Sequence, residues 1–397
     1  MFYNTFGRFA VEWLSALDDE AAARRAAGLR RELRPRPAGD ADPVTDLAGN
    51  DYLGLSRHPH VLAAAVRALE GFGLGATGSR LVRGSTELHR DLEDGLAALL
   101  GMPSALVYSS GYLANLGAVR ALVRPGALVV SDAHNHASLV DGCRLACAGR
   151  SGREGAETVV APHADPDAVA ALLARHPGRP AVVVTESIFS VDGDLAPLPE
   201  LYAVARAHGA LMLVDDAHAL GVLGPSGAGG VAAAGLAGAP GLALTATLSK
   251  SLGAAGGVIA GPAQLRRALV DTGRTFIFDT ALPPAVAAGA LAALDLLRAG
   301  DALRSELHAR AGRAVARLRA DGLEVSEPAG GVISVAAPSP DEAVAWASAC
   351  RDRGVAVGCF RPPSTPDGRS RLRLTVNVGV PAPAFDRAID IILKERP

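Results

Sequence analysis

Short apolar runs alternate with helical stretches between Asp46 and about Leu282. The runs occupy residues 105–110, 127–132, 181–187, 210–216, 242–249 and 257–261. Helical stretches separate the first five runs, and the run 257–261 comes after them. The pattern therefore predicts an α/β fold whose mostly parallel sheet is covered by helices on both faces.

The pattern changes on both sides of this segment. Residues 14–34 carry alanine, leucine and arginine at helical spacing, and we expect that helix to stop at Pro35 and Pro37. After Pro284 come an alanine-rich helix (285–299), a second amphipathic helix, and the strand-like runs VISVAAP, VAVGCF and RLRLTVNV, which alternate as antiparallel strands do. We divide the chain into an amino-terminal helical arm (1–45), a large domain (46–284) and a smaller α+β domain (285–397).

Composition narrows the class of protein. The net charge of −2 gives no reason to expect nucleic acid or an anionic membrane as a partner. Every apolar stretch is interrupted before the roughly 18 residues of a spanning helix, and the first 20 residues do not resemble a signal peptide. Because the four cysteines, at 143, 147, 350 and 359, form no CxxC pair, we expect them to be reduced and structural, in a cytoplasmic protein.

Lysine is rare in this chain, and its rarity is informative. Only two of the 39 lysine and arginine residues are lysines, Lys250 and Lys394. A composition so strongly biased toward arginine should keep lysine where a primary amine is required, as in Schiff-base formation. Lys394 lies near the end of the chain, where a solvated cation at a helix end is the simpler interpretation. Lys250 follows an apolar run and lies among small residues, so it is the candidate Schiff-base lysine.

Two further segments fit a cofactor site beside Lys250. Asp215 and His218 lie where the run 210–216 ends, at the carboxyl edge of the predicted sheet, where open α/β folds bind ligands. A carboxylate there can keep a pyridine nitrogen protonated, although a strand-end aspartate is also common as a purely structural residue. Residues 108–118, YSSGYLANLGA, predict a strand, a turn and a helix start, whose free N–H groups suit a phosphate.

Two other patterns are less specific. GLGATG (73–78) matches a dinucleotide fingerprint in its letters, but it follows a helical stretch where that fingerprint needs a strand. Asp132, His134 and His136 contain the residue types of a metal site. Their spacing fits no helical ligand pair and no acidic motif completes them, so we predict no metal.

Seven segments together resemble the α-oxoamine synthases, a family of fold-type I pyridoxal-phosphate enzymes, over nearly the whole chain. They are NDYLGLSRHP (50–59), GATGSRLVRGSTELHRDLE (75–93), SSGYLANLGAV, HASLVDGCRLA, VVVTESIFSVDGDLAPL, VDDAHALGVLG and TLSKSLGAAGG, in that order. The resemblance implies an aspartate aminotransferase-like fold, a pyridoxal 5′-phosphate cofactor and a homodimer.

The resemblance also implies roles for particular residues. Lys250 would bind the cofactor covalently and later act as the base at the substrate Cα, while Asp215 would bind the pyridine nitrogen. The other expected cofactor contacts are Thr247 at the phosphate, Gly111 and Tyr112 on the phosphate and ring side, His136 stacked on the ring, and His218 and Ser190 near the ring oxygen. The expected substrate contacts are Arg30, Asn50, His136, Ser364 and Arg361, the last of these gripping the amino-acid carboxylate.

Two positions depart from the family pattern. Ser364 stands where threonine is more common, which keeps a hydroxyl. Asp279 and Thr280 stand where the family often has Ser-Thr, so Thr280 keeps the expected contact with the phosphate of the neighbouring subunit and Asp279 has no assigned role.

The implied reaction joins an amino acid to an acyl thioester with loss of carbon dioxide. We expect L-alanine and a pimeloyl thioester, carried by coenzyme A or by an acyl carrier protein. Glycine with acetyl-CoA or succinyl-CoA, and serine with a long-chain acyl-CoA, remain alternatives that share the chemistry. A cofactor-binding regulator without catalysis would need a DNA-reading domain and a basic patch, and the first 45 residues contain neither.

Overall fold

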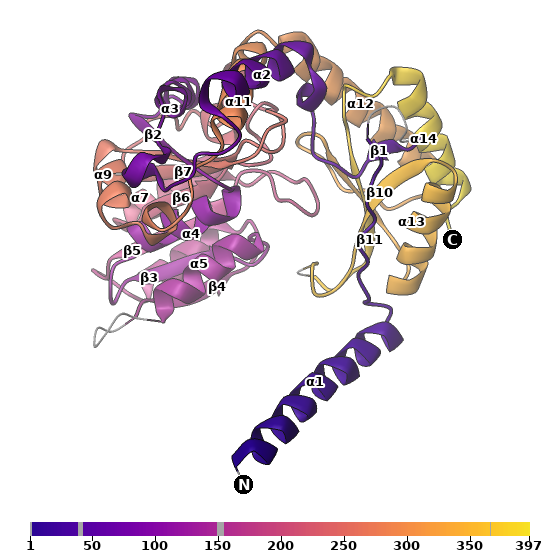
Figure 1. Ribbon diagram of the computed structural model, residues 1–397, viewed down its shortest axis with the longest axis horizontal. Helices are drawn as coiled ribbons and strands as arrows, with labels where there is room; N and C mark the ends of the chain where they lie inside the picture. Colours follow the sequence, from indigo (N-terminus) through magenta and orange to yellow (C-terminus); the bar gives the residue numbers. More distant parts are fainter. Residues whose placement is uncertain (1, 39–42, 149–154, 366) are drawn as a thin grey trace.

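The large part of the molecule is built on a seven-stranded sheet (Figure 1). The computed structural model describes residues 2–38, 43–148, 155–365 and 367–397. The sheet contains β2 (Ser104–Tyr108), β3 (Leu128–Asp132), β4 (Glu157–Ala161), β5 (Ala181–Glu186), β6 (Leu211–Asp215), β7 (Leu242–Thr247) and β8 (Gly257–Gly261), in the order β2-β8-β7-β6-β5-β3-β4. Only β8 runs antiparallel to its neighbours, so the predicted mostly parallel sheet is confirmed.

Helices cover both faces of this sheet, because alternate strand residues point to opposite sides. Leu106, Val129 and Leu213 belong to the apolar cluster on one face, while Val107 and Val130 belong to the cluster on the other. The helices are α2 (Pro59–Phe72), α3 (Glu87–Leu100), α4 (Gly111–Leu122), α5 (Ala137–Cys147), α6 (Pro166–Ala174), α7 (Leu198–Ala207), α8 (Gly230–Ala233), α9 (Ala263–Thr272), α10 (Arg274–Ile277) and α11 (Pro284–Arg298).

The smaller sheet confirms the predicted antiparallel strands and adds one strand. Its order is β1-β10-β11-β9, with β1 (Thr45–Leu47), β9 (Val332–Ala336), β10 (Val355–Phe360) and β11 (Arg371–Thr375). The helices α12 (Asp301–Ala320), α13 (Pro340–Asp352) and α14 (Ala382–Lys394) complete this part. We expected residues from 46 onward to belong to the large domain, but β1 pairs in parallel with β10, and Leu47 is fully buried.

The amino-terminal helix ends earlier than the sequence pattern predicts. Helix α1 spans Phe2–Ala26, and residues 29–38 are not helical. Gly28 has a φ of +66°, and the N–H of Leu29 bonds back to the carbonyl of Arg24, which is how a glycine terminates a helix. The prediction of a helix to residue 34 was therefore wrong. Residues 13–26 are all exposed, and α1 projects away from the rest of the molecule (Figure 1).

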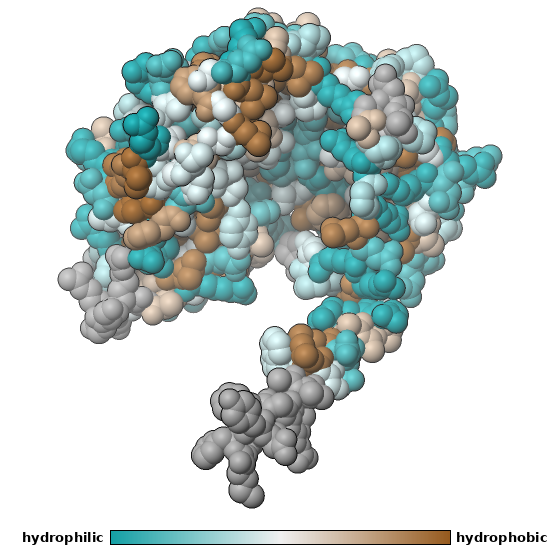
Figure 2. Space-filling view, in the orientation of Figure 1, coloured by the Kyte–Doolittle hydropathy of each residue, from teal (hydrophilic) through white to brown (hydrophobic). Residues whose placement is uncertain are grey.

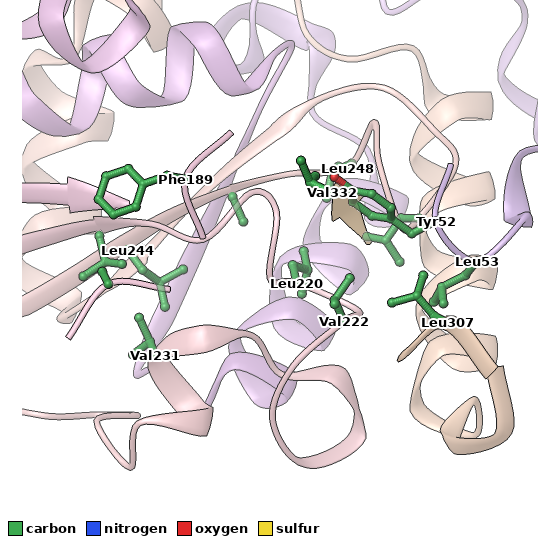
Figure 3. Close-up of a cluster of buried hydrophobic side chains, with 14 of the residues drawn as sticks. Tyr52, Leu53, Phe189, Leu220, Val222, Val231, Leu244, Leu248, Leu307 and Val332 are labelled. Atoms are coloured by element: carbon green, nitrogen blue, oxygen red, sulfur yellow. The ribbon is translucent and has the colours of Figure 1, made fainter. Parts of the chain in front are cut away.

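A continuous apolar core joins the two sheets. Tyr52, Leu307 and Val332, from distant parts of the chain, lie together in it (Figure 3). This packing holds the small sheet against the loops that follow the carboxyl ends of the large sheet's strands. Within the described residues, no helix is long and apolar enough to cross a membrane.

Candidate active site

Lys250 lies in the turn after β7, a strand whose residues are all buried. It lines a cavity of about 260 Å³ together with Asp215, His136 and the first residues of α4. Its Nζ lies 2.9 Å from Nε2 of His218. The structure thus brings together residues that lie as far apart in the sequence as Ser110 and Lys250, which are 140 positions apart.

The environment of Lys250 favours the neutral amine. Burial, reinforced by the positive charge of Arg373, lowers the pKa of Lys250 to about 8, although the Asp215 carboxylate acts in the opposite direction. A neutral amine is the nucleophile that imine formation requires. Lys394, by contrast, lies exposed in the last turn of α14, as the sequence predicted.

Asp215 is fixed at the carboxyl end of β6 with its carboxylate on the cavity. Its Oδ2 accepts a 2.7 Å hydrogen bond from Asn115, and its Oδ1 accepts one from the N–H of Ala217 at 3.0 Å. Thr245 donates to the amide oxygen of Asn115, which orients that amide so that its NH₂ faces Asp215. The carboxylate is therefore held in place, where it can accept a hydrogen bond from a donor group bound in the cavity.

A second acid, Glu186, lies beside Asp215 at the end of β5. Burial, together with the neighbouring Asp215 carboxylate, raises the pKa of Glu186 well above its ordinary value. Oε1 of Glu186 accepts a 2.6 Å hydrogen bond from the N–H of His136. Burial also lowers the pKa of His136, whose Nδ1 lies 2.6 Å from the Ser138 hydroxyl. His136 is therefore a neutral, oriented ring in the cavity wall.

The opposite side of the cavity is the start of α4. The Ser110 side chain caps this helix by accepting from the N–H of Leu113, and the first-turn N–H groups have no partner within the helix. A Cβ on Gly111 would lie 3.2 Å from the Cβ of Thr247, so glycine lets the helix start approach β7 closely. Thr247 and Ser249 contribute hydroxyl groups 2.8 Å apart.

These residues fit pyridoxal 5′-phosphate. A fixed carboxylate suits a protonated pyridine nitrogen, a neutral amine suits an aldehyde, and a helix start with hydroxyl groups suits a phosphate. Tyr112 lines the same cavity and donates a 2.5 Å hydrogen bond to Asp141. The cavity therefore brings together the lysine, the aspartate and the helix start that the sequence analysis selected, and their roles toward the cofactor stay predictions.

A buried polar network continues from His218 away from the cavity. The Tyr52 hydroxyl lies 2.6 Å from Nδ1 of His218, and Arg373 donates to Oδ1 of Asn50 at 3.1 Å. Burial, followed by the charges of Lys250 and Arg373, lowers the pKa of His218 well below its ordinary value. His218 is therefore neutral beside Lys250.

Several predicted site residues lie outside this cavity. Arg361 donates to the carbonyl of Gly28, and Ser364 accepts from Arg31 at 2.9 Å. Arg30 and Arg361 line a second cavity, of about 700 Å³, between the amino-terminal arm and α13. Ser190 does not line the Lys250 cavity, and its carbonyl accepts from Arg373 at 2.7 Å. The roles predicted for these residues stay predictions.

Thr280 is exposed and pairs with Ser79 in an isolated bridge. Its neighbour Asp279, which had no assigned role, accepts a hydrogen bond from Ser109. That bond connects the segment before α11 to the turn that carries Gly111. Asp279 is therefore a structural partner of the α4 turn.

The two less specific patterns have structural explanations. GLGATG follows helix α2, and its Gly73 is the residue at which that helix ends. His134 stacks on His163 with ring centroids 3.8 Å apart, and Asp132 bonds to the same His163 ring at 2.9 Å. Among the described residues, no group of three or more His, Cys, Asp or Glu could hold a metal ion.

Sequence reasoning missed four residues of the site. Glu186 was within reach, because it ends a predicted strand beside the strand of Asp215, and Asn115 lay in a quoted segment. Tyr52 also lay in a quoted segment, but no pattern in the sequence placed Tyr52 or Arg373 at the site, since each meets it only through the packing of the small sheet.

Comparisons with known proteins agree with this geometry. The family model for class I and II aminotransferases matches residues 42–392. The chain is similar to the 8-amino-7-oxononanoate synthase of Mycolicibacterium vanbaalenii, with 52% identity over 374 residues and 94% of each chain. It is also similar to that of Mycobacterium avium, with 54% identity over 378 residues, 93% of this chain and 92% of the relative.

A solved serine palmitoyltransferase from S. paucimobilis, with a bound PLP–myriocin aldimine, has the same fold. Its TM-score is 0.87 at 29% identity, covering 97% of this chain and 98% of that one. The chain is a pyridoxal-phosphate-dependent enzyme of fold type I. It belongs to the class I and II aminotransferase family and, within it, to the family of the 8-amino-7-oxononanoate synthases.

Proposed function

We propose that this enzyme condenses L-alanine with a pimeloyl thioester, releasing carbon dioxide and the free thiol and forming 8-amino-7-oxononanoate for biotin biosynthesis. The names of relatives at 52–54% identity over nearly the full length support this acyl donor and product. The observation that best supports this chemistry is that Lys250, whose pKa is lowered, and the fixed carboxylate of Asp215 line the same small cavity.

The residues of the cavity have separate tasks. When bound, the cofactor supplies an electron sink for the charge that develops at the alanine Cα. Asp215 holds the proton on the ring nitrogen, and the start of α4 with Thr247 holds the phosphate. Lys250 would hold the cofactor through Nζ, and, once freed from it, the same amine would take the proton from Cα and later return a proton to the product.

The carboxylate of alanine needs a cation close to Lys250. The sequence favours Arg361 for this task, but Arg361 is bonded to the carbonyl of Gly28. Arg373 is buried, and its charge acts on both Lys250 and His218. We therefore propose Arg373, together with Asn50, as the second candidate for the carboxylate, since its charge reaches the reacting amine.

We also propose a cytoplasmic homodimer in which Thr280 completes the site of the partner. Thr280 is exposed, and the nearby side chains of Val82 and Phe278 are 77% and 70% exposed. A further apolar group on α2 is exposed on the same molecule, as Figure 2 shows, and consists of Leu62, Val66, Leu69 and Phe72. Such gathered apolar surface is typical of a protein interface. Light scattering after size exclusion tests the dimer.

Turnover of purified holoenzyme tests the reaction. L-alanine, glycine and L-serine are each combined with pimeloyl-CoA, a pimeloyl-acyl carrier protein, acetyl-CoA, succinyl-CoA and palmitoyl-CoA, and thiol release is measured. We expect turnover with alanine and a pimeloyl thioester, and the two pimeloyl donors show which carrier is used. Turnover only with glycine or serine would overturn the proposal.

A further inference from the structure

Tyr52 contacts His218, a residue of the cavity wall, through its hydroxyl group. It is fully buried and lies among Leu53, Leu307 and Val332 (Figure 3). Its hydroxyl lies 2.6 Å from Nδ1 of His218, while Nε2 of the same ring lies 2.9 Å from Nζ of Lys250. Tyr52, for which the sequence predicted no role, is thus separated from the Lys250 amine only by the His218 ring.

The direction of these hydrogen bonds follows from the chemistry of Arg373. A guanidinium donates hydrogen bonds and cannot accept them. Arg373 donates to Oδ1 of Asn50, so this oxygen already accepts one hydrogen bond, and the positive charge of Arg373 also acts on the Tyr52 phenol. Burial raises the pKa of Tyr52 to about 12, and the phenol therefore keeps its proton.

That single phenolic proton has two acceptors within reach. Nδ1 of His218 lies at 2.6 Å, and Oδ1 of Asn50 lies at 3.4 Å and already accepts from Arg373. The shorter contact takes the proton, so Nδ1 of His218 is an acceptor. Because His218 is neutral, its only ring proton is then on Nε2, the atom that faces Lys250.

We propose that Tyr52 is a positioning residue that holds His218 in the Nε2–H tautomer, so that this ring donates its hydrogen bond into the cavity. In the apo cavity the acceptor is the lone pair of the Lys250 amine. With cofactor bound, the same N–H is available to the ring oxygen, and this part of the inference rests on the proposed function. A donor at this point steadies the oxygen without adding a charge beside Lys250.

Nitrogen NMR of the imidazole ring reads the tautomer directly. Holoenzyme with ¹⁵N-labelled histidine is measured at about pH 8, above the ordinary histidine pKa of about 6.5. The His218 signals are assigned by their loss in His218→Gln. We expect Nε2 to be the protonated nitrogen of His218 in the wild type. In Tyr52→Phe, Nδ1 loses its donor, and we expect the Nδ1–H tautomer to become populated.

The matched control is Tyr108→Phe, because Tyr108 is also buried but lies in a different cavity, against Thr275. It should leave the His218 signals unchanged. The inference is wrong if wild-type His218 carries its proton on Nδ1, or if folded Tyr52→Phe keeps the wild-type tautomer. If Tyr52→Phe does not fold, the protonated nitrogen of His218 in the wild type tests the inference by itself.

Kinetics provide a second readout. We expect Tyr52→Phe to lower kcat while leaving KM for alanine nearly unchanged. The substitution changes which nitrogen of His218 carries the proton, and it removes no group proposed to bind alanine. A rise in KM with an unchanged kcat would contradict the inference. The NMR reading needs no turnover, so a failure of the alanine and pimeloyl reaction is distinguishable from a failure of this inference.

Discussion

Nζ of Lys250 lies 2.9 Å from Nε2 of His218, and burial lowers the pKa of both groups. Two bases at this distance would repel each other if both were protonated. The free amine of Lys250 therefore forms at a lower pH than that of an ordinary lysine, and this has a measurable consequence for cofactor attachment.

We expect the rate of covalent cofactor attachment to rise with pH and to level off above about 8, because burial and Arg373 lower the pKa of Lys250 to that value. An ordinary lysine, with a pKa of about 10.4, would still be gaining rate at pH 9. Absorbance at the visible edge, followed after adding pyridoxal phosphate to apoenzyme, measures the rate. Lys394→Arg, on the exposed end of α14, is the control and should show the same profile.

Asp215→Asn should reduce kcat by about 10- to 150-fold, since it removes a charge-assisted hydrogen bond worth about 1.5–3 kcal/mol from the ring nitrogen. The amide has the same shape, so Asn115 and the N–H of Ala217 can still contact the side chain. Steady-state turnover and the cofactor content of the purified protein are measured together. Full turnover in a cofactor-loaded Asp215→Asn would argue against the assigned role.

Arg373→Gln and Arg361→Gln distinguish the two candidates for the alanine carboxylate. If Arg373 binds it, Arg373→Gln raises KM for alanine by at least about tenfold, as expected for loss of a buried charged partner. The same variant removes a positive charge, so the pKa of Lys250 should rise and the attachment profile should move to higher pH. A large KM effect in Arg361→Gln alone would restore the assignment that the sequence favours.

Much of this site followed from the sequence because it depends on strand ends. Lys250 and Asp215 follow apolar runs of a parallel sheet, and such ends meet on one edge whatever the loops do. Glu186 obeys the same rule and was missed only because a strand-end acid beside another acid gave no separate signal. Tyr52 could not be found, because its position depends on how two sheets pack.

The amino-terminal arm shows a different limit of prediction from the sequence. Residues 14–34 have helical spacing, yet a single left-handed glycine at position 28 ends the helix, and local propensity does not specify that turn. The short strand β1 was also missed, since three residues carry too little pattern and its parallel partner β10 is about 310 residues away in the chain.

His163 gives the fold a pH dependence of known sign. Burial lowers its pKa, but hydrogen bonds to Asp132 and Asp194, each 2.9 Å long, outweigh burial and raise the pKa to about 9. The stabilisation is therefore fully present below the unfolded value of about 6.5 and is lost as pH rises through about 9. Thermal unfolding at pH 6, 7.5 and 9 should show a falling Tm, with a smaller fall in His163→Gln. Equal slopes for the two proteins would contradict this prediction.

Reduction of the holoenzyme with borohydride, followed by peptide mapping, identifies the residue that binds the cofactor covalently. We expect one pyridoxyl group per chain on the peptide that contains Lys250, and no visible band or trapped adduct in Lys250→Ala. An adduct on Lys394, on the amino terminus, or on no residue would contradict this expectation.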